Sequence, residues 1–198
     1  MARVLKYING SLVEYEVFKL VDFYDPILRK PTELFEFKDE NSLREANFYG
    51  YSLSETLQKL QGLGLSANQV GINKRICVIN MGDKNWILFN PVIVSKSNEL
   101  STFSEGCLSY PGLYLKIPRA ASIVVKFQAM NGQWVEETVN GIAAVCLQHE
   151  LDHLDGIVYT DRVSELKLNQ AKKKVKKTLK QMSRLTADQV AKLTRASY

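Results

Sequence analysis

The sequence predicts an α+β fold, with antiparallel or mixed sheets around a central helix that carries an HExxH pattern and with a further helix at the C-terminal end. Strand-like and helix-like segments follow one another without the regular βαβ alternation of parallel α/β proteins. Asn-Gly pairs at residues 9–10 and 131–132 stand between strand-like runs, which is typical of β-hairpins. Residues 142–154 have the periodicity of a helix with one buried face.

In the N-terminal half, the first hairpin turns at Asn9-Gly10, and Asp25-Pro26 and Pro31 then mark a loop. Ser52 predicts the start of a helix, because Glu55 three residues later completes a capping box. Leu53, Leu57 and Leu60 give this helix an apolar face, and Gly62 predicts its end. Strands are expected at residues 75–81 and 85–94.

In the C-terminal half, a hairpin is expected around Asn131-Gly132, followed by the helix from Ile142 to Leu154. A last helix begins near Ser164, and Thr186 and Gln189 suggest a short final one. The last long helix has an apolar stripe that we expect to pack on the body of the protein, formed by Leu168, Ala171, Val175, Leu179 and Met182.

The chain of 198 residues predicts three parts: an N-terminal extension (1–20), a body (21–163) and a basic C-terminal helix (164–198) packed on the same domain. Its longest apolar run, Ile142 to Leu147, is far shorter than the ~20 residues that span a bilayer. The N-terminus has no signal-peptide pattern, and three cysteines fit a reducing compartment. We therefore expect a cytoplasmic monomer without a membrane partner.

The charge is unevenly distributed. Residues 162–198 carry 11 basic and two acidic side chains, a net charge of +9, whereas the residues before them carry 15 basic and 19 acidic side chains, a net charge of −4. This asymmetry predicts a polyanionic partner for the tail alone.

The segment QHELDH, residues 148–153, carries the chain's only two histidines. On a helix, His149 and His153 are four residues apart and project from one face, so that both imidazoles can bind one metal ion. Glu150 can reach a water molecule beside that ion as a general acid or base. A surface helix with incidental histidines is disfavoured, because an apolar run directly precedes the motif.

A hydrolytic site of this kind usually has three protein ligands, so a cysteine or a carboxylate must be the third. Cys146 lies about 10 Å from residue 153 along a helix axis with a rise of ~1.5 Å per residue, which puts a short side chain out of reach. Cys77, inside the apolar run RICVIN, is expected in the core. Cys107 remains, in SEGCLSYPG, where small neighbours suit a loop that crosses close to another element.

The segment GLGLSANQVG, residues 62–71, matches the GxGxxG/A dinucleotide fingerprint at Gly62, Gly64 and Ala67. That fingerprint follows a strand and opens a helix, whereas here a helix precedes it and a strand follows. Nucleotide binding is therefore disfavoured. We expect a tight backbone that approaches a ligand and presents Gln69, whose amide can donate to an oxyanion.

Taken together, GLGLSANQVG, EGCLS and HELDH resemble the three signature motifs of peptide deformylase, in the order and at the separations of that family. The resemblance covers about residues 20–180 and places the catalytic domain in residues 21–163. Ser66 departs from the alanine that the family usually has, and about twenty residues precede the usual family start.

The resemblance implies that Cys107, His149 and His153 bind one divalent metal ion, physiologically Fe²⁺, although Zn²⁺, Ni²⁺ or Co²⁺ can occupy such a site. Glu150 matches the general acid/base, and Gln69 with the backbone N–H of Leu108 matches the oxyanion stabilisers. The family reaction removes the N-formyl group from the N-terminal methionine of newly made polypeptides and releases formate.

The resemblance also implies a methionine pocket, with Gly64 in backbone contact with the peptide. Its lining would be Leu63, Phe103, Ile142, Val145 and Cys146. Glu105 and Arg119 resemble a paired acid and base with a structural role. The family's C-terminal helix implies a contact with the ribosome for the basic tail.

Two other functions stay open from sequence. A zinc metallopeptidase also uses HExxH, but needs a downstream ligand, and Glu165 is the only glutamate after Glu150. A nucleic-acid or ribosome-binding module would depend on the basic tail.

Overall fold

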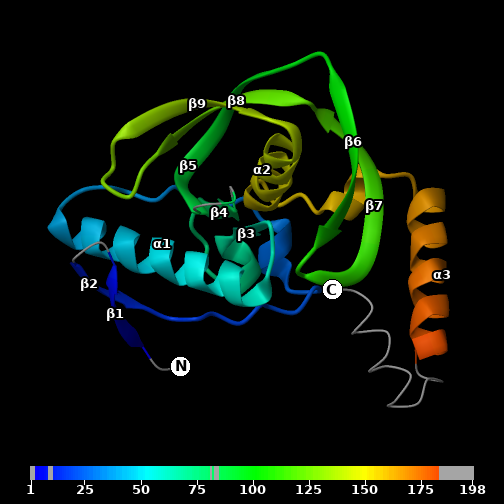
Figure 1. Cartoon of the computed structure of the whole chain (residues 1–198), viewed down its shortest axis with the longest axis horizontal. Helices are drawn as coiled ribbons and strands as arrows, with labels where there is room; N and C mark the ends of the chain where they lie inside the picture. Colours follow the sequence, from blue (N-terminus) through cyan, green and yellow to red (C-terminus); the bar gives the residue numbers. More distant parts are fainter. Residues whose placement is uncertain (1–2, 9–10, 81, 83–84, 183–198) are drawn as a thin grey trace.

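The computed structural model describes residues 3–8, 11–80, 82 and 85–182 (Figure 1). Three helices, nine strands and three short 3-10 segments occur in that part of the chain. In chain order they are β1 (Val4–Ile8), β2 (Ser11–Tyr15), η1 (Pro26–Arg29), α1 (Glu40–Leu60), β3 (Gly64–Ser66), η2 (Ala67–Val70), β4 (Ile76–Asn80), β5 (Asn85–Lys96), β6 (Leu100–Cys107), β7 (Tyr110–Ala120), β8 (Ser122–Gln128), β9 (Trp134–Asn140), α2 (Gly141–Leu154), η3 (Tyr159–Arg162) and α3 (Glu165–Met182).

The strands form three sheets in which every pair is antiparallel. β1 pairs with β2, β6 pairs with β7, and a five-stranded sheet has the order β3-β4-β5-β8-β9. The α+β prediction is therefore confirmed, as are the strands expected at 75–81 and 85–94 and the hairpin around Asn131-Gly132. No helix in the described residues is both long and apolar enough to cross a membrane.

The five-stranded sheet separates two apolar clusters, because strand side chains alternate between its faces. In β4, Ile76 and Val78 pack with Leu53 and Leu57 of α1, whereas Cys77 and Ile79 join the cluster of α2. Cys77 is completely buried, as expected of a core residue.

Helix α2 lies between the five-stranded sheet and the β6–β7 hairpin, which curves over its other side (Figure 1). Its apolar residues Ala144, Leu147, Leu151 and Leu154 pack against the sheet. Residues 147–154 are all buried, including the polar ones. This enclosure gives the HELDH motif a low-dielectric environment near the centre of the molecule.

The expected start of the first helix at Ser52 is wrong. Helix α1 begins twelve residues earlier at Glu40, where Asp39 and Ser42 cap each other's backbone N–H groups. Ser52 is instead buried in mid-helix, and its hydroxyl accepts a hydrogen bond from the backbone N–H of Glu16. The helix ends at Leu60 as expected, although Gln61 rather than Gly62 adopts the left-handed conformation.

The loop expected around Cys107 is a tight hairpin turn. Residues up to Cys107 belong to β6, and β7 starts at Tyr110. The eleven residues of β7 were missed, although Leu113, Leu115 and Ile117 alternate as a half-buried strand should.

Helix α3 starts at Glu165, next to the expected Ser164, and packs on the body through Leu168, Ala171 and Val175. The expectation that the whole stripe packs is wrong for Leu179, which is 61% exposed because α3 runs past the end of the β6–β7 hairpin (Figure 1). The Met182 side chain, the Asn9-Gly10 turn and the expected caps Thr186 and Gln189 lie outside the described residues.

Candidate metal centre and active site

Cys107, His149 and His153 come together at the centre of the molecule. Their ligand atoms all lie within 4.8 Å of one another, and all three residues are buried. The Cys107 Sγ is 3.2 Å from Nε2 of His153. Cys107 arrives at the last position of β6, and the histidines come from successive turns of α2. One thiolate and two imidazoles form a donor set that suits Zn²⁺ and other divalent transition metals, so these residues fit a metal ion.

His149 is oriented by a buried carboxylate. Its Nδ1 lies 3.0 Å from Oε2 of Glu105, which directs Nε2 away from Glu105. Glu105 also accepts two hydrogen bonds from Arg119, at 2.8 and 2.9 Å. Arg119 donates in turn to Asp152 on α2 at 2.6 Å. Such a partner on the second ring nitrogen fixes the tautomer and the ring orientation of a metal-binding histidine.

The two histidines are held in different electrostatic environments. Burial, together with the nearby charges of His149 and Arg119, keeps the pKa of His153 well below its usual value. Burial also tends to lower the pKa of His149, but hydrogen bonds with Cys107 and Glu105 outweigh it and raise this pKa to about 10. The anionic groups around His149 therefore favour a positive charge at the cluster, which a metal ion supplies.

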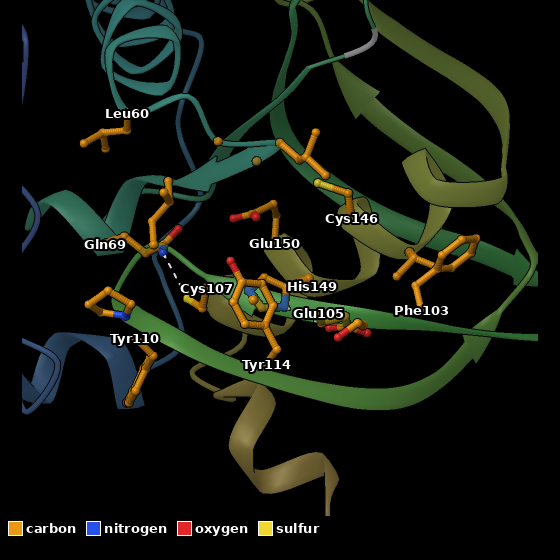
Figure 2. A pocket seen from close by; sticks show the side chains of 18 of the residues that line it. Leu60, Gln69, Phe103, Glu105, Cys107, Tyr110, Tyr114, Cys146, His149 and Glu150 are labelled. Carbon is orange, nitrogen blue, oxygen red and sulfur yellow. Dashed lines mark hydrogen bonds and ion pairs between the residues drawn. The ribbon is translucent and has the colours of Figure 1, made fainter. Parts of the chain in front are cut away.

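Gln69 points its amide nitrogen at the cluster from the opposite wall of the site (Figure 2). Its Nε2 donates to Oγ of Ser109 at 3.0 Å and lies 3.5 Å from Sγ of Cys107. Leu108, next to Cys107, lines the same cavity. The structure thus brings the two expected oxyanion stabilisers beside the expected metal ligands.

Glu150 is buried, and its carboxylate projects into the same cavity (Figure 2). Burial raises the pKa of Glu150 to about 7, against the lowering effects of the charges of His149 and Arg119. Its Oε2 has no hydrogen-bond partner among the described residues. A carboxyl group in this environment suits proton transfer.

A cavity of about 480 Å³ opens onto the cluster. All six residues expected to bind substrate line it, namely Leu63, Gly64, Phe103, Ile142, Val145 and Cys146. Val145 lies deep in the cavity, whereas Leu63, Phe103 and Ile142 are exposed at its rim. An apolar cavity with a few convergent polar groups is typical of a small-ligand site.

Several supporting residues were missed by sequence reasoning. Asp152 pairs with Arg119 and Arg162, and the Tyr159 ring centroid lies 5.4 Å from that of His149. Ser66 donates to the side-chain oxygen of Gln69. A signal for that contact was present, because Ser66-x-x-Gln69 matches the capping-box pattern. Asp152 and Tyr159 carry no local signal, since their partners are distant in sequence.

Comparisons with known proteins agree with this geometry. Residues 17–169 match the family model described as polypeptide deformylase. A peptide deformylase of Agrobacterium fabrum is 37% identical over 163 residues, which are 80% of this chain and 94% of that protein.

Solved structures give the same result. A peptide deformylase from Thermotoga maritima is 38% identical, with a TM-score of 0.69 and coverage of 75% of this chain and 99% of that one. One from Legionella pneumophila is 34% identical, with a TM-score of 0.73 and coverage of 86% and 100%. From these matches and from the enclosed Cys–His–His cluster, we conclude that the chain belongs to the polypeptide deformylase family.

Proposed function

We propose that Cys107, His149 and His153 hold one divalent metal ion, and that Glu150, Gln69 and Leu108 act on the formyl group beside it. As a member of its family, the chain is a metal-dependent hydrolase that removes the N-formyl group from the N-terminal methionine of newly made polypeptides. The main support for these residue roles is the buried Cys–His–His cluster, which faces a cavity that Glu150 and Gln69 also line.

We propose Fe²⁺ as the physiological ion, with Zn²⁺, Ni²⁺ and Co²⁺ as alternatives that the same donor set accepts. A divalent ion in such a site supplies Lewis acidity, which polarises a carbonyl group and makes water a nucleophile at neutral pH. Glu105 supports this site, because its hydrogen bond keeps the His149 ring in one orientation.

The polar residues then have separate tasks. As the formyl carbon becomes tetrahedral, negative charge develops on the formyl oxygen, and Gln69 Nε2 and the Leu108 N–H stabilise it by donating hydrogen bonds. Glu150 takes up at its carboxylate the proton of the water that attacks the formyl carbon, and delivers it to the departing amine nitrogen as the C–N bond breaks. Its burial removes competing solvent from this transfer.

The methionine side chain occupies the apolar part of the cavity. Val145 and Cys146 on α2 form its floor, and Phe103 and Ile142 lie at the rim, where they leave space for the rest of the peptide to continue into solvent. Gly64 brings the β3 backbone beside this channel. An unbranched thioether suits such an irregular apolar cavity.

The direct test is release of formate from formyl-Met-Ala-Ser, with acetyl-Met-Ala-Ser as the matched control and an internal-peptide cleavage assay run in parallel. We expect turnover of the formyl peptide alone. Cleavage of an internal peptide bond without formate release would favour a metallopeptidase instead. Among the described residues, the group beside the histidines contains Cys107 and not Glu165, which speaks against that alternative.

We also propose that the basic helix α3 associates with ribosomal RNA, because the substrate of the enzyme emerges from the ribosome. Six lysines within nine residues of this helix are exposed, namely Lys172, Lys173, Lys174, Lys176, Lys177 and Lys180. We further propose that the enzyme is cytoplasmic, where nascent chains are made, and that it is a monomer. We likewise propose the division into residues 1–20, 21–163 and 164–198, because the family match begins near the first boundary, at residue 17, and α3 begins near the second, at Glu165.

A further inference from the structure

Ser66 places two donors on a single oxygen of Gln69. It is the last residue of β3 and is completely buried. Both its backbone N–H and its hydroxyl donate to Oε1 of Gln69, each at 2.9 Å. A buried hydroxyl without a partner would be costly, and Gln69 supplies the acceptor that satisfies this one.

These two bonds decide which end of the amide faces the metal cluster. With Oε1 held by Ser66, Nε2 is directed to Oγ of Ser109 and Sγ of Cys107. A rotation of the amide by 180° would place the NH₂ group against the donors of Ser66 and the carbonyl oxygen against the Cys107 sulfur. The observed arrangement is therefore strongly preferred over the flipped one.

We propose that the Ser66 hydroxyl is a positioning group for deformylation, which holds the Gln69 amide so that Nε2 is available to the formyl oxygen. Ser109 restrains the other end of the same amide. Because the charge on the formyl oxygen develops only in the transition state, Ser66 acts on turnover rather than on substrate binding. This inference rests on the proposed role of Gln69.

The first test compares Ser66→Ala with Ser52→Ala in the zinc-loaded enzyme. Ser52 is equally buried, but its hydroxyl accepts from Glu16 N–H on the far side of the sheet. We expect Ser66→Ala to lower kcat on formyl-Met-Ala-Ser about five- to tenfold with KM within about twofold, as for the loss of one orienting hydrogen bond. Ser52→Ala should retain wild-type kcat, and both variants should retain one zinc.

The second test shows whether Ser66 acts through Gln69. In a Gln69→Ala background, Ser66→Ala should cause no further loss of kcat. In NMR spectra of the zinc enzyme, the side-chain amide protons of Gln69 should exchange slowly, and Ser66→Ala should shift their resonances and speed their exchange.

Two outcomes would overturn the inference: a Ser66→Ala enzyme with the kcat of Ser52→Ala, or losses that multiply with those of Gln69→Ala. The proposed role of Gln69 fails separately, if Gln69→Ala itself keeps full kcat. In that case the amide resonances still decide whether Ser66 holds the side chain.

Discussion

Gly64 and Glu150 lie in direct contact at the active-site cavity. A β-carbon on Gly64 would clash with Oε1 of Glu150 and stand 2.8 Å from Sγ of Cys146. Strand β3 therefore approaches α2 more closely than any side chain permits. The backbone φ of Gly64 is not in the left-handed region, so the backbone conformation does not require glycine here. The close approach to α2 does.

Gly64→Ala should displace Glu150, because the new β-carbon would overlap its Oε1 and force the carboxylate out of its place beside the cluster. We expect at least a tenfold loss of kcat with metal content unchanged, and a loss of about 1–3 kcal/mol in the free energy of unfolding from overpacking. Formate-release kinetics, metal analysis and denaturant unfolding measure the three quantities. An alanine variant with wild-type turnover would show that Glu150 can shift without consequence.

Cys107→Ala should lose the metal and the activity together, since it removes one of three buried ligands. Cys146→Ala is the matched control, because Cys146 also borders the cavity but lies outside the cluster. It should keep one metal ion per chain. The metal-to-protein ratio after anaerobic purification distinguishes them, and stoichiometric metal in Cys107→Ala would falsify the ligand assignment.

Glu150→Gln should bind metal normally but lose at least about a hundredfold in kcat, because it keeps the shape of the side chain and removes its proton transfer. Glu165→Gln makes the same chemical change at an exposed position and should retain full activity. Gln69→Ala should cost less than Glu150→Gln, since the metal and the Leu108 N–H still face the developing charge. Near-normal turnover of Glu150→Gln would assign the acid/base role to another group.

Glu105→Gln should destabilise both the protein and its metal site. The substitution removes one of the two carboxylates that pair with buried Arg119 and leaves Asp152 as its charged partner, at a cost of about 1–3 kcal/mol in unfolding free energy. It also weakens the hydrogen bond that orients His149, for which we expect a 10- to 100-fold loss of metal affinity.

The control for that substitution is Glu14→Gln, which breaks the exposed pair with Arg3 and should cost less than about 1 kcal/mol. Denaturant unfolding and competition with a metal chelator give both values. Equal stability losses for the two variants would refute a special role for the buried pair.

Replacing four α3 lysines by glutamine should weaken co-sedimentation with ribosomes at low salt and leave turnover of formyl-Met-Ala-Ser unchanged. The four are exposed and lie away from the cavity, namely Lys172, Lys173, Lys176 and Lys177. A control of equal charge replaces four exposed lysines elsewhere, Lys19, Lys30, Lys59 and Lys116. If both sets reduce co-sedimentation equally, α3 has no specific role in it.

The sequence by itself determined the parts of this protein that depend on local periodicity. The four-residue spacing of His149 and His153 predicts their common helix face. Short apolar runs predict β4 and β5, and the Asn131-Gly132 pair between two strand-like runs predicts the β8–β9 hairpin. Cys107 could be predicted as well, because helix geometry argues against Cys146 and the apolar run around Cys77 places that residue in the core. These inferences need only the chain's neighbours within one or two turns.

Only the tertiary structure decided how distant segments support the site. Glu105 contacts His149, and Ser66 and Ser109 hold opposite ends of the Gln69 amide. Gly64 has no side chain and so leaves room for Glu150. These contacts exist because β3, β6 and η2 converge on α2. No local pattern encodes such contacts. They result from the burial of α2 between the sheet and the β6–β7 hairpin, where most buried polar groups pair with whichever segment packs beside them.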